Sequence, residues 1–261
     1  MMVSNFITND GGRDLRTRLL ELVENSEEMK FLVGFFYFSG IRELYQGLKN
    51  HPSSLLKILV GMKVDELNYK LIEHGYDDPA QSLNEKKEDF LNGVRRSLRN
   101  EDFDTQEFYE QINFFVDLLK SGRLVIRKTL EPNHAKIYFF IDEENVNAEK
   151  LFITGSSNLT KPALTTQAEF NVQIRDFGIE ETEAYFDALW DNAIKITEDD
   201  EERQKLIKVI SDDTIAREIT PFEAYALTLK TYIESYEQEE IGRNIKDLLR
   251  KNGYIPYKYQ L

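Results

Sequence analysis

A histidine and a lysine two residues apart, His134 and Lys136, are the residues in this sequence best suited to chemistry. They come directly before the apolar, β-rich run 137–141, and a second such run at 151–154 predicts a neighbouring strand. Because side chains alternate along a strand, both residues are expected on one face of it. The polar sequence Gly-Ser-Ser-Asn follows the second run at 155–158. If the strands are neighbours, an imidazole, an ammonium, an amide and hydroxyl groups meet at one place.

Such a set of groups suits phosphoryl chemistry. An imidazole can act as the nucleophile, a lysine ammonium can bind phosphate oxygens, and neutral donors can stabilise developing charge. Each residue also has a structural interpretation: Lys136 can extend from a sheet edge, and Ser156 and Ser157 can be ordinary turn residues. We expect Lys136 and Asn158 to contact phosphate and Ser156 to act with them, while Ser157 forms the turn.

The combination H-x-K at 134–136 and G-S-x-N at 155–158 resembles the half-site signature of the phospholipase D superfamily. That superfamily includes lipases, cardiolipin synthases and metal-independent nucleases. The flanking sequence most resembles its nuclease branch and the phospholipase D-like domains at the N-termini of bacterial helicases. By this resemblance Glu169 orients the catalytic histidine, although a structural ion pair is an equal alternative. Ile141 replaces the aspartate that the family places five residues after the lysine, and Asp142 would point to the opposite face.

The resemblance implies a covalent mechanism that needs neither a metal nor a cofactor. His134 would attack phosphorus to give a phosphohistidine, while Lys136 and Asn158 neutralise the non-bridging oxygens. A second histidine must protonate the leaving oxygen. The other two histidines of the sequence, His51 and His74, lack a lysine two residues later and are expected to be surface or helix-end residues. The resemblance therefore predicts a homodimer with the site at its two-fold interface, or a partner that supplies the second half-site.

The composition restricts the class of protein further. The 261 residues include no cysteine, which excludes disulfides and thiolate zinc sites and fits the reducing cytoplasm. No apolar run is long enough for a membrane helix, so we expect a cytoplasmic protein without a membrane partner. The net charge of −14 argues against a general nucleic-acid coat. Residues 123–175, however, carry seven Lys and Arg against six Asp and Glu, which permits a phosphate ligand there.

The pattern of elements predicts an α/β fold, with a mixed, largely parallel sheet flanked by helices, over residues 1–196. Buried strands at 29–38 and 55–60, joined through a helix at 40–49, form a parallel pair with a right-handed crossover. Residues 197–261, which begin with the acidic run 198–202, are expected to form a helical C-terminal extension or linker. The remaining expected helices are 13–24, 63–74, 84–98, 105–119, 179–194, 201–210, 221–236 and 241–251, and the remaining strands are 124–128 and 170–174.

Two functions of different classes remain open. The first is a metal-independent phosphodiesterase or nuclease that acts on nucleic acid, with DNA favoured, as the N-terminal module of a helicase or restriction-type protein. Residues 256–261 resemble the start of a helicase adenine-recognition motif, so a helicase or ATPase domain is expected in the same full-length chain. The alternative is a catalytically silent binding or dimerisation domain, favoured by Ile141 and the acidic surface. A lipid-acting enzyme ranks third, because no basic amphipathic face is found.

Overall fold

The computed structural model describes residues 5–10, 14–62, 82–99, 106–142 and 149–213. Residues 1–216 form one compact unit of the chain, and only this unit contains described residues. The helices predicted at 63–74, 221–236 and 241–251 lie outside the described part, and so does the helicase-like motif at 256–261. Among the described helices, none is long and apolar enough to cross a membrane.

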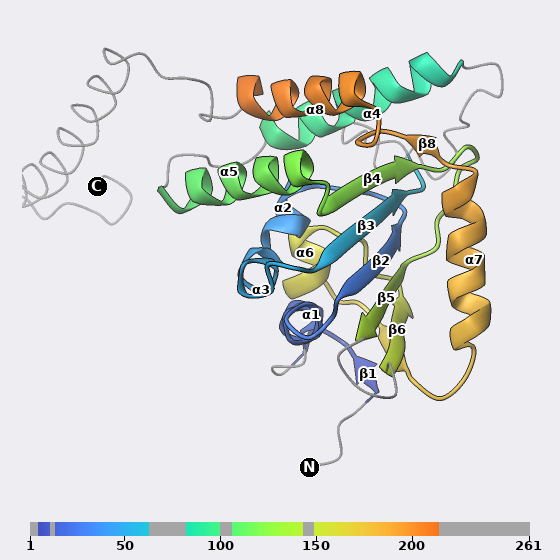
Figure 1. The fold of residues 1–261 in the computed structure, drawn as a ribbon. Helices are drawn as coiled ribbons and strands as arrows, with labels where there is room; N and C mark the ends of the chain where they lie inside the picture. The colour runs from blue at the N-terminus through green and yellow to red at the C-terminus, as the bar shows by residue number, and fades with distance from the viewer. Residues whose placement is uncertain (1–4, 11–13, 63–81, 100–105, 143–148, 214–261) are drawn as a thin grey trace, which may run out of the picture. The chain divides into compact units, whose positions relative to one another are not determined.

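Eight strands form one sheet, in the order β1-β7-β6-β5-β2-β3-β4-β8 (Figure 1). Their bounds are β1 Phe6–Ile7, β2 Glu28–Val33, β3 Leu55–Val60, β4 Leu124–Lys128, β5 Ile137–Asp142, β6 Glu149–Gly155, β7 Asn171–Ile174 and β8 Ile194–Lys195. The continuous apolar or β-branched runs that predicted β2 to β6 are typical of strands buried on both faces, whereas burial alternates along β7. The edge strand β1 and the two-residue β8 were not predicted, because two residues give no periodicity to recognise.

The α/β class with a mixed sheet flanked by helices is confirmed, but the expectation of a largely parallel sheet is wrong. Only the pairs β2–β3 and β3–β4 are parallel, and the other five pairs are antiparallel. Antiparallel neighbours need only a short connection, whereas parallel neighbours need a crossover of a dozen residues or more. β5 and β6 are separated by only six residues, 143–148. The short connection gives the antiparallel pairing in the part of the sheet that carries the motif residues.

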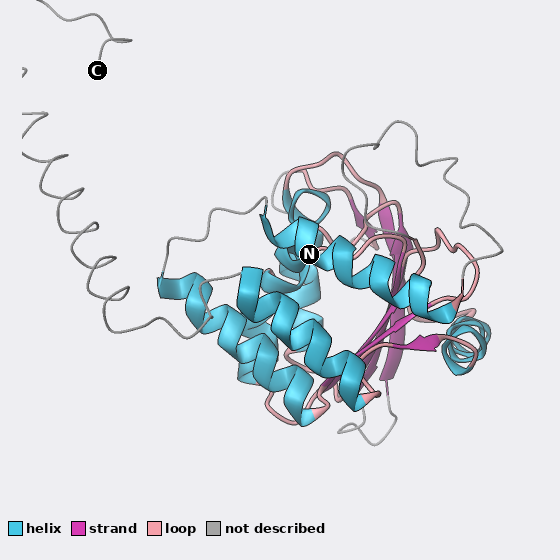
Figure 2. Cartoon of the chain, turned by 90° about the horizontal axis from the view of Figure 1, so that it is seen from above, coloured by secondary structure: helices cyan, strands magenta, loops and turns pink. Residues whose placement is uncertain are grey.

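Helices cover both faces of the sheet unequally (Figures 1 and 2). Among the described helices, only α7 contributes to the smaller core cluster, where its Phe186 and Trp190 pack with Leu32 and Phe139 of the sheet. The other helices pack in the larger cluster on the opposite face. Their bounds are α1 Leu15–Val23, α2 Phe38–Arg42, α3 Tyr45–Asn50, α4 Leu83–Arg99, α5 Gln106–Ser121, α6 Lys161–Thr165 and α8 Asp200–Asp213, and those of α7 are Ile179–Asp191. Both faces of the sheet are therefore covered by apolar clusters along its centre.

Buried ion pairs fix α7 to the sheet. Lys30 of β2 is only 5% exposed, and its Nζ lies 2.9 Å from carboxylate oxygens of both Glu183 and Asp187. Lys150 of β6 contacts the second oxygen of Glu183 at 2.6 Å. A buried charge is tolerated when it is paired in this way. These contacts explain a lysine within the apolar run of β2 and hold α7 in register with β2 and β6.

The last described helix, α8, packs with the sheet-bearing unit. It lies against α4 and α5, and its Leu206, Ile207, Val209 and Ile210 are buried in the larger core cluster. The division between residues 196 and 197 stays a prediction, but the helix directly after it shares its core with the residues before it.

Candidate active site

His134 and Lys136 lie directly before β5, in the segment that enters the strand, and not inside it. The Lys136 Nζ lies 2.9 Å from both ring nitrogens of His134 and 2.7 Å from the His134 carbonyl oxygen. The lysine is 5% exposed, whereas the imidazole is exposed to solvent. An imidazole accessible to a substrate thus lies against a largely buried amine, as expected for a nucleophile beside a phosphate-binding cation.

The loop that carries His134 is fixed by Asn133. The Asn133 side chain accepts a hydrogen bond from the Ala135 N–H at 2.9 Å and donates one to the Tyr185 hydroxyl of α7 at 3.0 Å. Its backbone N–H donates to the Gly61 carbonyl at 3.0 Å. A Cβ on Gly61 would lie 1.9 Å from the Asn133 carbonyl oxygen, so only glycine permits this approach. The end of β3 and the helix α7 therefore position the loop before the histidine.

Asn158 reaches the same place from the end of β6. Its side-chain oxygen accepts a hydrogen bond from the Phe35 N–H at 3.1 Å, which leaves the amide NH₂ as a donor. A Cβ built on Gly34 would lie 3.1 Å from this oxygen, 3.3 Å from His134 Cδ2 and 3.7 Å from Lys136 Nζ. Three of the five predicted site residues therefore meet around Gly34, the residue that follows β2.

Gly34 was missed as a site residue in the sequence. It falls within the apolar run 29–38, which predicted one continuous strand, whereas β2 ends at Val33 and the chain then turns into α2. A glycine inside a strand-like run often marks a close approach of another group, and this was the available signal. The next residue, Phe35, presents its ring edge-on to His134, with centroids 6.3 Å apart.

The segments after β2 and β6 run side by side. Phe36 and Leu159 form a parallel bridge, and the Tyr37 N–H donates to the Leu159 carbonyl at 3.4 Å. A Cβ on Gly40 of α2 would lie 2.1 Å from that carbonyl oxygen, so the helix approaches the backbone directly. This contact fixes the position of Asn158 relative to Gly34.

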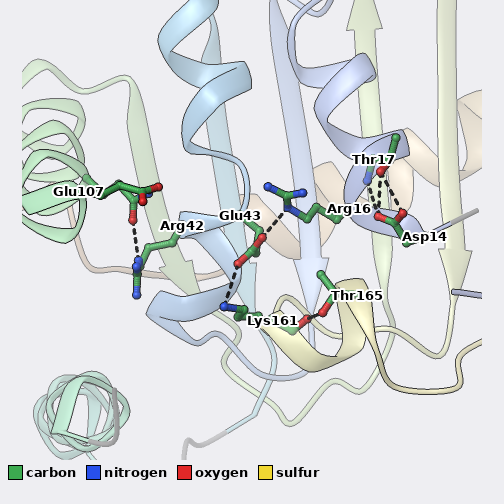
Figure 3. Close-up of polar contacts among 9 residues, drawn as sticks. Asp14, Arg16, Thr17, Arg42, Glu43, Glu107, Lys161 and Thr165 are labelled. Carbon is green, nitrogen blue, oxygen red and sulfur yellow. Dashed lines mark hydrogen bonds and ion pairs between the residues drawn. The ribbon is translucent and has the colours of Figure 1, made fainter. Parts of the chain in front are cut away.

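An ion-paired glutamate holds the helix that follows Asn158. Glu43, at the C-terminal end of α2, contacts Arg16 of α1 at 2.5 Å and Lys161 of α6 at 3.8 Å (Figure 3). The side chain of Thr160 caps α6 by accepting from the Ala163 N–H. Although α6 has only five residues and was not predicted, Glu43 connects it, and with it the end of the Gly-Ser-Ser-Asn segment, to α1 and α2.

Ser156 and Glu169 form a hydrogen-bonded pair beside these residues. The Ser156 hydroxyl donates to the Glu169 carboxylate and accepts from the Phe170 N–H at 3.1 Å. The Ser156 N–H donates to the Phe170 carbonyl at 3.2 Å, so the turn after β6 continues its pairing with the residues before β7. The negative charge of Glu169 raises the pKa of Lys136. Both residues therefore belong to the surroundings of Lys136, and an orienting role of Glu169 toward His134 stays a prediction.

Ser157 is a buried turn residue, as expected. It is 0% exposed, its hydroxyl donates to the Ala163 carbonyl at 3.3 Å, and it accepts from the Asn171 amide at 2.9 Å. The Asn171 side-chain oxygen accepts from the Ser157 N–H at 3.3 Å. This two-point contact by the fully buried Asn171 was also missed, because an asparagine at the start of a strand has no distinctive pattern. It fixes the turn between Ser156 and Asn158.

Burial sets the protonation of the lysine. Burial lowers the pKa of Lys136 from 10.5 to about 8, and the nearby Glu169 carboxylate partly opposes that change. The amine is thus mostly an ammonium at neutral pH and loses its proton slightly above it. Burial also raises the pKa of Tyr138, whose hydroxyl donates to the Ser157 carbonyl at 2.9 Å, so the phenol remains neutral and structural.

Ile141, at the position where the phospholipase D superfamily has an aspartate, lies at the other end of β5. Ile141 is 4% exposed and packs in the smaller core cluster. At a rise of about 3.3 Å per residue, the five residues from Lys136 to Ile141 span roughly 16 Å. Asp142 is one residue farther along the strand. Neither side chain is therefore within reach of the imidazole.

Among the described residues, the one other histidine, His51, has contacts away from this site. His51 lies at the end of α3, with its Nε2 3.2 Å from a Glu27 carboxylate oxygen, and His74 lies outside the described part. Across the described ranges, no group of three or more His, Cys, Asp or Glu side chains is arranged to hold a metal ion.

Comparison with known proteins gives one match in sequence and several in structure. Residues 83–190 match the family model described as "Cardiolipin synthase, PLD-like domain". No curated protein matches the sequence significantly. The solved structures that resemble the chain include the phospholipase D family member Nuc from Salmonella typhimurium, with 14% identity, 73% of this chain and 95% of that chain covered, and a TM-score of 0.40. NucT from Helicobacter pylori shows 12% identity over 73% of this chain and 96% of that one, with a TM-score of 0.42. Phosphatidylserine synthase from Haemophilus influenzae shows 18% identity over 82% of this chain and 47% of that one, with a TM-score of 0.45.

Proposed function

We propose that this chain carries a phospholipase D-like domain, the family whose model residues 83–190 match, and that the domain is a phosphodiesterase that cleaves nucleic acid, with DNA as the substrate. The observation that carries the proposal is the meeting of His134, Lys136 and Asn158 around Gly34. These residues supply a nucleophile, a cation and an amide donor within one small region. Phosphoryl transfer depends mainly on such positioning and charge stabilisation.

The proposed reaction has two steps through a phosphohistidine. First, an unprotonated ring nitrogen of His134 attacks phosphorus, an N–P bond forms, and the P–O bond to the leaving nucleoside breaks. Water then attacks phosphorus, and the N–P bond breaks to release the phosphate monoester. In both steps the Lys136 ammonium and the Asn158 NH₂ bind the non-bridging oxygens. Both ring nitrogens lie equally close to Lys136, so this contact by itself does not select the attacking nitrogen.

The leaving oxygen requires a proton donor that the described residues of one chain do not provide at this site. We assign that role to His134 of the partner subunit in a symmetric homodimer, because a two-fold axis brings one residue into contact with its own copy. The same imidazole would then activate the water of the second step. The exposure of His134 is consistent with this arrangement. Glu169, held by Ser156, would maintain the ammonium form of Lys136 and orient the imidazole.

A cleavage assay in EDTA tests the proposal. Labelled DNA is incubated with the wild-type protein, with His134→Ala and with His51→Ala, a matched control whose imidazole contacts Glu27 instead. The proposal requires cleavage by the wild type and by His51→Ala in the presence of chelator, and no cleavage by His134→Ala. Cleavage that persists in His134→Ala would overturn it.

A silent binding or dimerisation domain is the second candidate function. It is favoured by Ile141, because a buried isoleucine stands where the family has an aspartate. A dimeric sample that binds DNA but leaves it intact would establish this alternative. The helicase association stays a prediction, since residues 256–261 lie outside the described part of the chain.

A further inference from the structure

Two phenylalanine rings lie exposed and in contact beside the candidate active site. Phe6 of β1 is 52% exposed and Phe170 is 57% exposed, and their ring centroids are 5.5 Å apart at an interplanar angle of 34°. Phe6 is opposite Val172 in the β1–β7 pair, so Phe170, two residues before Val172, is its diagonal neighbour on the same face. Such a pair can stabilise the edge of the sheet, and its exposed ring faces also offer a ligand a flat apolar surface.

The backbone of Phe170 links this pair of rings to the turn after β6, which leads to Asn158. The backbone of Phe170 is hydrogen-bonded to Ser156 in both directions, through its N–H to the hydroxyl at 3.1 Å and through its carbonyl to the N–H at 3.2 Å. The preceding residue, Glu169, accepts the hydrogen bond of Ser156. A substrate whose phosphate contacts Lys136 would therefore extend over this part of the sheet edge.

The charge of the chain bears on which part of a nucleic acid these rings would bind. The chain has a net charge of −14, and the site itself contains one buried lysine amine. Neutralisation of many phosphates, which supplies most non-specific affinity, is therefore a poor source of binding here. Stacking of a base on an aromatic side chain does not depend on net charge, and it contributes about 5- to 100-fold in affinity per base.

We propose that Phe6 and Phe170 form a stacking platform for unpaired nucleobases next to the scissile phosphate, so that the substrate is single-stranded nucleic acid. This inference rests on the proposed phosphodiesterase function and adds the strand preference to it. Bases of an intact duplex are already stacked on one another and cannot lie on the rings without unpairing.

The size of the platform favours a base over a second protein surface. Two half-exposed phenylalanine side chains present roughly 200 Å² of apolar surface. A stable protein interface needs about 800 Å² per partner, several times more. The area instead fits one or two nucleobases.

The test compares the double variant Phe6→Ala/Phe170→Ala with Phe177→Ala, which removes another phenylalanine that is 70% exposed, in the segment between β7 and α7. Affinity and EDTA-resistant cleavage are measured with a single-stranded oligonucleotide, with an abasic oligonucleotide of the same length, and with a duplex. We expect the double variant to bind the single strand about 5- to 100-fold more weakly. Its binding and cleavage of the abasic strand should be unchanged, and Phe177→Ala should match the wild type. Phe170→Trp keeps a stacking surface and should retain affinity.

Several results would contradict the proposed stacking platform without contradicting the proposed phosphodiesterase function. One is an equal loss of affinity for the abasic and the base-containing strand, and another is no loss at all. A third is dissociation of a wild-type dimer by the double substitution, detected by sedimentation, which would identify the rings as part of an interface between two copies. Failure of the wild type to cleave any strand would instead contradict the proposed function itself.

Discussion

The hydrogen that Gly34 carries in place of a side chain faces the amide of Asn158. A Cβ at this position would lie 3.1 Å from the Asn158 side-chain oxygen, closer than about nine in ten Cβ contacts in proteins. The same atom would approach the His134 ring at 3.3 Å. Gly34 thus provides the space in which residues from the ends of β2 and β6 and the start of β5 meet.

The substitution Gly34→Ala should impair activity more than stability. The added methyl group must displace Asn158 or His134 by a few tenths of an ångström, and misplacement of catalytic groups by about 1 Å can cost as much as 100-fold in rate. We expect kcat/KM for DNA cleavage to fall by about tenfold or more. The free energy of unfolding, measured by chemical denaturation, should change by less than about 1.5 kcal/mol.

Gly122→Ala is the matched control for that variant. Gly122 has a φ of +75°, and a Cβ there would meet no atom within 4 Å. The alanine introduces backbone strain without touching the site, so stability should fall by about 1 kcal/mol while kcat/KM stays unchanged. Equal effects of the two variants on activity would show that Gly34 has no special relation to the site.

The rate should depend on the protonation of Lys136. Its pKa is lowered by burial to about 8, and the ammonium, not the neutral amine, neutralises phosphate oxygens. As pH rises through about 8 the proton is lost, so kcat/KM should decline by about tenfold per pH unit above that value. A pH profile between 6 and 10 measures this. A rate that stays constant up to pH 10 would remove Lys136 from the phosphate site.

Glu169→Gln should shift that decline to lower pH. The carboxylate raises the pKa of Lys136, so its replacement by a neutral amide lowers that pKa and the ammonium is lost earlier. Lys136→Arg should show the opposite behaviour, since a guanidinium keeps its proton throughout this range. If the decline stays at the same pH in both variants, another group controls it.

Asn171→Ala should destabilise the fold through the turn before Asn158. The substitution removes two buried hydrogen bonds to Ser157, which is 0% exposed. Loss of partners for buried polar groups should lower the free energy of unfolding by about 2 kcal/mol or more. The control Asn192→Ala removes an exposed hydrogen bond to the Ala188 carbonyl and should change it by less than about 0.5 kcal/mol.

The sequence was most informative where apolar periodicity was strong. The runs that became β3 and β4 were predicted to the residue, and β5 to within one residue, whereas the run 29–38 extends five residues beyond the end of β2. The mostly antiparallel direction of neighbouring strands was not predicted. A buried strand has the same continuous apolar run whether its neighbour is parallel or antiparallel. The lone lysine of β2 gave no indication of its partners on α7, since Glu183 and Asp187 are more than 150 residues away.

The sequence predicted the types of residue that form the site, but it predicted their geometry only in part. His134, Lys136 and Asn158 were recognised because their spacing is distinctive, and the structure brings them together. Gly34 leaves room for the side chains of Asn158 and His134, and Asn171 holds the turn at Ser157. Both roles depend on contacts between segments that are distant in the sequence. Glu169 was expected beside His134, and its hydrogen bond is made by Ser156.

Mixed dimers test whether two chains share one site. When wild type and His134→Ala are mixed in equal amounts and allowed to exchange, only wild-type homodimers would hold two histidines, about one quarter of the dimers. Activity should therefore fall to about one quarter of that of the same total amount of wild type. A fall to one half would mean that each chain acts alone.

The covalent intermediate tests the central claim most directly. The wild-type protein is mixed with DNA in EDTA, quenched in alkali, where phosphohistidine is retained, and digested for mass spectrometry. We predict a peptide in which His134 carries a nucleotide fragment through phosphorus, present in the wild type and absent in His134→Ala. Continued cleavage with no such adduct on His134 at any quench time, or with the adduct on another residue, would contradict the account.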